Sequence, residues 1–241
     1  MNPSPGSGLV SKQMARTRQS QHTYTEFCME LSPNRLNELL AEANLPILQP
    51  TQSKQFNDYL SLILRWNART NLTSVRDPET ILSRHFVESI ACAQALPAHI
   101  ATLLDYGSGA GFPGVPIAIC RPAIAVTLAE SQGKKAAFLQ EAIRLTGISA
   151  KVHSGRAETL TAQFDCLTLR AVEHMEQAVR SAERLVSPNG WLLLMTTESD
   201  LPTLQAAVSS AFRWSTPTPL PGGESRILAL AQQTENQPPT T

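Results

Sequence analysis

The first part of the chain carries hydrophobic residues at helical spacing. In one stretch Phe56, Tyr59, Leu60, Ile63 and Leu64 recur every three or four positions, which places them on one face of an α-helix. Two flanking stretches have shorter versions of this pattern, and each helix is expected to begin at a capping residue. The expected caps are Ser32 before Pro33, Thr51, and Asp77 before Pro78. The pattern predicts three helices before residue 98.

From residue 102 the pattern changes to short apolar runs separated by helix-like segments. The strand-like runs are 102–106, 124–130, 150–154, 164–170 and 190–197, with helices expected near 114–120, 133–146, 173–186 and 200–212. Strands that alternate with helices form βαβ units and a parallel sheet. The end of the chain differs, because two strand-like stretches, near 213–219 and at 226–230, are joined by a Pro-Gly-Gly turn without a helix. This hairpin is expected to add an antiparallel edge strand.

Composition divides the chain into four expected segments. Residues 1–30 and 233–241 are polar and poor in large apolar side chains, so we expect a disordered extension and a disordered tail. Between them we expect an N-terminal helical region at 31–98 and a ligand-binding α/β domain at 99–232. With 42% hydrophobic residues, the chain of 241 residues can bury a substantial core.

Charge and cysteine usage narrow the class of protein. Lys+Arg and Asp+Glu each total 20, so any contact with nucleic acid must come from a local basic patch. Cys28, Cys92, Cys120 and Cys166 form no C-x-x-C pair and are expected to be reduced thiols of a cytoplasmic protein. No apolar run approaches the ~20 residues of a membrane span, and no signal peptide is recognisable.

A glycine-rich loop follows the first strand-like run. Its glycines allow a tight turn and leave room for a ligand at the carboxyl edge of the sheet. Read from Gly109, the loop matches the G-x-G-x-x-G pattern of dinucleotide sites; read from Asp105, it is D-x-G-x-G-x-G, typical of S-adenosylmethionine (AdoMet) sites. Asp105 suits a cationic sulfonium, and Pro113 and Pro116 remove N–H donors that a phosphate would need. These details favour AdoMet, and a Rossmann-type NAD-binding protein is the alternative.

A polar connector between the second and third predicted helices is a candidate RNA-binding segment. Arg69 and Arg76 lie in it, and Arg84 and His85 follow shortly after. Arginine and histidine side chains can contact a phosphate backbone. Acidic residues in the same span offset much of this charge, so an interhelical loop with ion pairs fits the residue types equally well.

Several motifs then occur together and in a fixed order. They are Asn71–Pro78 continued by Arg84–Ser89, Asp105–Pro116, Arg121-Pro122, Glu130, Gly133–Lys135, Gly155–Glu158 and Arg170-Ala171. The loop ends in P-G-x-P, which generic methyltransferases lack. In this order the motifs resemble the ribosomal RNA small subunit methyltransferase G family, also called glucose-inhibited division protein B. The resemblance implies a Rossmann-like class I methyltransferase fold: a mostly parallel seven-stranded α/β sheet with an antiparallel terminal strand, preceded by the helical region.

The family resemblance also implies an activity and a site. It implies an AdoMet-dependent enzyme that methylates N7 of a guanosine in 16S (small-subunit) rRNA, with the rRNA or an assembling subunit as partner. No protein partner is implied, and the hydropathy already argues against a membrane. Because guanine N7 has a lone pair and no proton, no general base is expected. A metal is not expected either, since no residue cluster has metal-ligand spacing. Together with the loop pattern, the resemblance implies cofactor contacts at Asp105, Gly107, Gly109, Gly111, Phe112, Glu130, Ser131, Gln132, Ala157, Glu158 and Arg170.

One departure from the family leaves the acceptor open. Where the family usually has lysine and glycine after the fifth strand, this chain has Met195–Ser199, without a lysine. An AdoMet-dependent methyltransferase with another acceptor is therefore the runner-up hypothesis.

Overall fold

The computed structural model describes residues 34–234. The expected extension at 1–30, the cap at Ser32-Pro33, Cys28, and the tail from residue 235 lie outside the described residues. The described residues from Leu36 onward belong to one compact unit, so the helices before residue 98 and the sheet after it pack together. None of the described helices is long and apolar enough to cross a bilayer.

The three predicted helical segments are present, with one change at a cap. They are α2 (Arg35–Glu42), α3 (Pro50–Asn67) and a continuous helix made of α4 (Pro78–Thr80), the π-helical turn Ile81–Phe86 and α5 (Val87–Ala95). Asp77 caps as predicted, since its carboxylate accepts from the Thr80 N–H at 2.7 Å. The prediction of Thr51 as a cap was wrong: Pro50 takes the first helical position, and the preceding Gln49 donates its N–H to the Gln52 side chain at 2.9 Å.

The alternating region forms one mixed sheet. Its strands are β1 (Thr102–Tyr106), β2 (Ala125–Ala129), β3 (Ala150–His153), β4 (Phe164–Arg170), β5 (Val186–Thr197), β6 (Phe212–Trp214), β7 (Thr218–Pro219) and β8 (Arg226–Gln233). The order β3-β2-β1-β4-β5-β8-β6 is parallel from β3 to β5, and β8 runs antiparallel to both of its neighbours. The antiparallel strand was predicted at the sheet edge, but it lies between β5 and β6, where its backbone pairs with β5 on one side and with β6 and β7 on the other.

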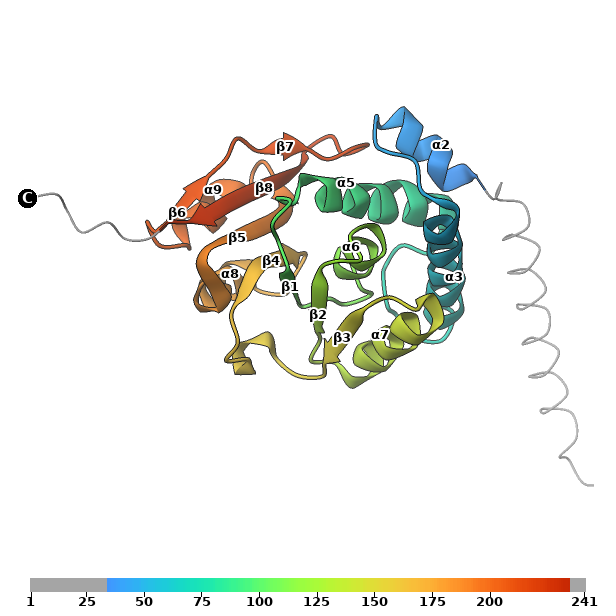
Figure 1. The fold of residues 1–241 in the computed structure, drawn as a ribbon, viewed down its shortest axis with the longest axis horizontal. Helices are drawn as coiled ribbons and strands as arrows, with labels where there is room; N and C mark the ends of the chain where they lie inside the picture. Colours follow the sequence, from blue (N-terminus) through green and yellow to red (C-terminus); the bar gives the residue numbers. More distant parts are fainter. Residues whose placement is uncertain (1–33, 235–241) are drawn as a thin grey trace, which may run out of the picture. The chain divides into compact units, whose positions relative to one another are not determined.

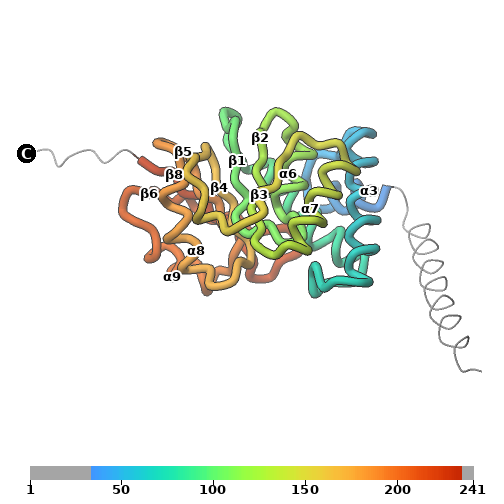
Figure 2. The backbone as a smooth tube through the Cα atoms, turned by 90° about the horizontal axis from the view of Figure 1, so that it is seen from below, coloured from blue at the N-terminus to red at the C-terminus, as the bar shows by residue number. Residues whose placement is uncertain are grey.

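Helices cover both faces of the sheet (Figure 1). Helices α6 (Gly114–Cys120) and α7 (Gly133–Thr146) lie on one face with α3 and α5, and α8 (Met175–Ala182) and α9 (Leu201–Ala206) pack on the other. Figure 2 shows α3 beside α7, where the Trp66 indole N–H donates to Glu141 at 2.8 Å. The N-terminal helices are therefore an outer layer of the sheet domain.

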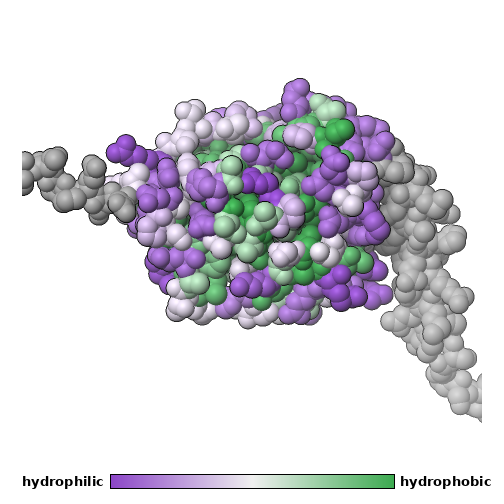
Figure 3. Space-filling model, in the orientation of Figure 1, coloured by the Kyte–Doolittle hydropathy of each residue, from purple (hydrophilic) through white to green (hydrophobic). Residues whose placement is uncertain are grey.

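Apolar strand residues fill the space between the layers. Leu104, Leu167, Leu192 and Leu194 are fully buried in a cluster with residues of α8 and α9. On the face shown in Figure 3, hydrophobic residues gather toward the middle and hydrophilic residues along the margin. Cys92 and Cys166 are buried and unpaired, and Cys120 is unpaired and partly buried.

Candidate functional site

The glycine loop lies at the carboxyl edge of β1 and is held by hydrogen bonds from both sides. Glu130, at the end of β2, accepts from the backbone N–H of Gly109 at 2.9 Å and of Gln132 at 2.7 Å. From the other side, the hydroxyl of the buried Tyr59 on α3 donates to the carbonyl of Ala110. A helix of the outer layer and a strand of the sheet thus set the shape of the loop.

Two adjoining cavities open around this loop. The larger, which we call the main cavity, has a volume of about 540 Å³, and the smaller inner cavity has about 210 Å³. Gly107, Glu130 and Ser131 line both of them. The main cavity is within the size range of small-molecule sites. It lies beside β1 and β4, where the strand order reverses, which is the usual ligand position in sheets of this type.

Most of the predicted cofactor residues meet at these cavities. The main cavity adds Gly109, Phe112, Gln132 and Arg170 to the shared residues. The inner cavity adds Ala157 and Glu158, which come from the turn after β3. Predicted cofactor residues as far apart in the sequence as Gly107 and Arg170 therefore converge on one site.

Two predicted contact residues are turned away from both cavities. Asp105 is 1% exposed, and its carboxylate accepts from the N–H of Gly114 at 3.2 Å and from the hydroxyl of Thr168 at 2.9 Å. Burial raises the pKa of Asp105 to about 6, partly offset by these hydrogen bonds. Gly111 is packed so closely that an added Cβ would come within 2.6 Å of the Tyr59 hydroxyl. Strand β1 directs the Asp105 side chain into the core, and Gly111 packs against Tyr59, so both residues support the loop from its buried side.

A π-helical turn brings two of the predicted RNA-binding residues to the main cavity. Arg84 and His85 lie in the π-helix Ile81–Phe86, and both line that cavity. π-Helical turns are rare, usually a single turn inside an α-helix, and frequent at functional sites. The imidazole of His85 stacks on the Phe112 ring with 4.8 Å between centroids. Burial lowers the pKa of His85 to about 3, and the neighbouring Arg170, Arg84 and Arg226 add to the shift.

This depressed pKa predicts an acid-dependent loss of stability. Unfolded chains bind a proton to His85 near pH 6.5, whereas the folded protein does so only near pH 3. Between these values the unfolded state binds more protons, so stability falls as pH falls. Relative to His85→Phe, the wild type should lose about 1–2 kcal/mol of unfolding free energy between pH 7 and pH 5. Urea denaturation of both proteins at both pH values tests this; parallel pH profiles would contradict it.

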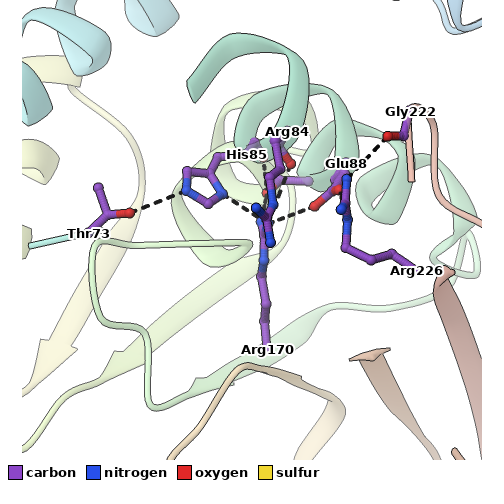
Figure 4. Close-up of polar contacts among 8 residues, drawn as sticks. Thr73, Arg84, His85, Glu88, Arg170, Gly222 and Arg226 are labelled. Carbon is purple, nitrogen blue, oxygen red and sulfur yellow. Dashed lines mark hydrogen bonds and ion pairs between the residues drawn. The ribbon is translucent and has the colours of Figure 1, made fainter. Parts of the chain in front are cut away.

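Glu88 on α5 joins two arginines from distant strands (Figure 4). Its carboxylate, 1% exposed, lies 2.6 Å from Nη2 of Arg170 at the end of β4 and 2.5 Å from Nε of Arg226 at the start of β8. Arg170 Nη2 also lies 2.9 Å from Nδ1 of His85. Burial lowers the pKa of Arg170 while the Glu88 charge opposes that shift. This network fixes the position of Arg170 at the wall of the main cavity.

The remaining predicted RNA-binding residues lie outside the cavities. Arg69 and Arg76 are exposed on the connector between α3 and α4, where Arg76 donates to the Asn71 side chain at 3.1 Å. The segment Met195–Ser199, which has no lysine, lines neither cavity. Within residues 34–234, the cationic side chains that line the main cavity are Arg84, Lys135 and Arg170.

Sequence reasoning included Arg170-Ala171 among the motifs but missed the backbone conformation of the turn after β4. Ala171 and His174 have positive φ angles of 49° and 52°, which is uncommon for residues other than glycine. Ala171 lines the main cavity and His174 the inner one, and strained backbone of this kind concentrates at functional sites. No residue type in this turn signals the strain, so the sequence offered no marker for it.

Comparison with known proteins places the chain among methyltransferases. The family model of rRNA small subunit methyltransferase G matches residues 52–215. Ribosomal RNA small subunit methyltransferase G of Stenotrophomonas maltophilia (strain K279a) is 44% identical over 140 residues, and so is that of Xanthomonas euvesicatoria pv. vesicatoria (strain 85-10). Each match covers 57% of this chain and 65% of the relative, so the match spans less than two thirds of the length of these curated relatives.

Solved structures support the fold. A ribosomal protein L11 methylase from Lactobacillus delbrueckii subsp. bulgaricus aligns with a TM-score of 0.54 at 12% identity, covering 66% of this chain and 80% of that one. TrmN from Thermus thermophilus aligns with a TM-score of 0.51 at 18% identity, covering 63% and 53%. At these identities the likeness concerns the fold alone, which is the Rossmann-like class I methyltransferase fold.

Proposed function

The chain belongs to the rRNA small subunit methyltransferase G family, and we propose on that premise that it transfers the methyl group of AdoMet to N7 of a guanosine in 16S (small-subunit) rRNA. The observation that carries this proposal is the pair of adjoining cavities at the carboxyl edge of β1 and β2. The proposed substrate is the rRNA itself or an assembling ribosomal subunit, and the proposed compartment is the cytoplasm.

The residues around the cavities fit AdoMet. Each oxygen of Glu130 accepts one backbone N–H and retains a lone pair, so the carboxylate can accept both ribose hydroxyls. In this proposal Ala157 and Glu158 flank the adenine in the inner cavity, and Arg170 faces the amino-acid end in the main cavity. AdoMet supplies a methyl carbon made electrophilic by a sulfonium.

The chain's own part in the proposed reaction is to position the acceptor and to exclude water. Guanine N7 attacks through a lone pair and releases no proton, so positioning provides most of the acceleration and no side chain need act as a base. The stacked pair of Phe112 and His85 forms one rigid wall of the main cavity. Arg84 is exposed beside it and can contact a phosphate of the RNA.

The proposal is tested with purified small ribosomal subunits and labelled AdoMet. We expect label in 7-methylguanosine of the 16S rRNA, identified by digestion and mass spectrometry. Label in another base or in protein would support the runner-up hypothesis of another acceptor. Binding of NAD without binding of S-adenosylhomocysteine, measured by calorimetry, would overturn the cofactor assignment.

Arg84 gives a further prediction. Arg84→Glu should weaken binding to small subunits roughly tenfold and make binding less sensitive to salt, because a phosphate contact is lost and a repulsion added. Its affinity for S-adenosylhomocysteine should be unchanged. The matched control is Arg213→Glu, which makes the same charge change at an exposed position of β6. Equal weakening in both variants, measured by filter binding, would show a nonspecific charge effect and remove Arg84 from the RNA site.

A further inference from the structure

A chain of hydrogen bonds leads from Arg170 to Thr73 at the main cavity (Figure 4). Arg170 Nη2 lies 2.9 Å from His85 Nδ1, and His85 Nε2 lies 3.3 Å from Thr73 Oγ1. A guanidinium can only donate, so Nδ1 of His85 must accept. The proton of the neutral imidazole is therefore on Nε2, which donates it to Thr73 Oγ1.

The surroundings keep this imidazole neutral. His85 is partly buried and is stacked on Phe112, and the charged groups that face it are the guanidiniums of Arg170, Arg84 and Arg226. Burial and these positive charges lower the pKa of His85 to about 3. A doubly protonated ring, which could not accept from Arg170, is therefore absent near neutral pH, and the direction of each hydrogen bond is fixed.

The fixed direction determines what the Thr73 hydroxyl can do. Thr73 Oγ1 also accepts from the backbone N–H of Val75 at 3.2 Å. A hydroxyl oxygen has two lone pairs, and here one accepts from His85 and the other from Val75. The hydroxyl can therefore make a further hydrogen bond only by donating its proton. Among residues 34–234, no protein group accepts this hydroxyl proton. Thr73 also lines the main cavity. The cavity thus presents a neutral, oriented hydrogen-bond donor.

A donor at this place distinguishes the two purines. On the edge that carries N7, guanine presents the acceptor O6, whereas adenine presents an N6 amino group that donates. N7 must keep its lone pair for the methyl group, so the donor is available for the atom at position 6. We propose that the Thr73 hydroxyl donates to O6 of the guanine that is methylated, and thereby selects guanine over adenine. This inference rests on the proposed function and adds the residue that reads the base.

Under the proposed function, the carboxylate of bound AdoMet would be a second acceptor in the main cavity, and it is less well matched to Thr73. An anion is bound most strongly by a charged donor, and Arg84 and Arg170 line the same cavity. A neutral hydroxyl held by a neutral imidazole suits a neutral carbonyl oxygen. The two possible acceptors of the Thr73 proton can be distinguished by experiment. Cofactor affinity depends on Thr73 only if the hydroxyl donates to the AdoMet carboxylate and not to guanine O6.

The test removes the donor and the acceptor separately. Small subunits are reconstituted with ligated 16S rRNA that carries guanosine, inosine or 2-aminopurine riboside at the nucleotide methylated by the wild type. Inosine retains O6 and N7, whereas 2-aminopurine retains N7 but lacks O6. The wild type should methylate guanosine and inosine at least roughly tenfold faster than 2-aminopurine riboside, in kcat/KM. Thr73→Ser, which keeps the hydroxyl, should retain this preference.

Thr73→Val, which has the same shape without the hydroxyl, should lose the preference. Its kcat/KM for guanosine should fall roughly tenfold, while its value for 2-aminopurine riboside should stay at the wild-type level. Its affinity for S-adenosylhomocysteine, measured by calorimetry, should also be unchanged, which shows that the variant is folded. An equal slowing on guanosine and 2-aminopurine riboside, or a loss of S-adenosylhomocysteine affinity, would overturn the inference. If the wild type methylates no guanosine at N7, the proposed function itself fails.

Discussion

Replacing Glu88 with alanine is expected to lower the free energy of unfolding by about 3–5 kcal/mol, because two guanidiniums then lose their shared counter-ion. Arg170 is only 12% exposed at its side chain, so its charge would remain buried without a carboxylate beside it. Arg226, 28% exposed, can turn toward solvent and contributes less to the loss. The substitution also releases Arg170 from its position at the wall of the main cavity, so affinity for S-adenosylhomocysteine should fall in the same variant.

Urea denaturation of matched variants measures this effect. The control is Glu176→Ala, which removes an exposed ion pair with Arg180 at 2.8 Å on α8 and should cost less than about 1 kcal/mol. Glu88→Gln keeps the shape of the side chain and one acceptor oxygen, so it should lie between the wild type and Glu88→Ala. A loss in Glu88→Ala no larger than that of the control would show that the Glu88 network does not stabilise the fold.

Gly107→Ala is expected to weaken the binding of S-adenosylhomocysteine at least roughly tenfold. Gly107 has φ +71°, which costs a residue with a Cβ about 1–2 kcal/mol. The added Cβ would also lie 3.1 Å from Cγ2 of Val172, and both residues line the main and inner cavities. Relief of this contact moves Val172 or the loop into the space proposed for the cofactor.

Gly147→Ala is the control variant that separates an effect on cofactor binding from the effect of backbone strain. Gly147 has φ +66° at the end of α7, and an added Cβ there meets no atom within 4 Å. Both variants should therefore lose stability in thermal denaturation through the same backbone strain, but only Gly107→Ala should lose affinity in calorimetry. Equal affinities in the two variants would contradict the placement of the cofactor at this loop.

Local sequence patterns predicted the bounds of those helices and strands whose structure depends mainly on their own residues. The strands at 102–106 and 164–170 and the helices at 114–120 and 133–146 have the predicted bounds. The hairpin turn predicted the pairing of β8 with the stretch near 213–219, but its position next to β5 inside the sheet was not predicted, since an apolar run indicates burial without indicating against which strand. Shorter helices at α8 and α9 show that the ends of elements depend on packing as well as on pattern.

The amino-acid sequence by itself determined the alternation of strands and helices, the glycine loop and the acidic residue at the end of β2, because each follows from spacing within a few neighbouring residues. The tertiary structure alone decided the direction of Asp105 into the core and the joining of Glu88 to Arg170 and Arg226, which are 82 and 138 residues away. It also decided the chain of hydrogen bonds from Arg170 through His85 that orients the Thr73 hydroxyl. The physical reason is that buried charges and hydrogen bonds need partners at distances of about 3 Å, and only the packing of β4, β8 and α5 brings those partners together.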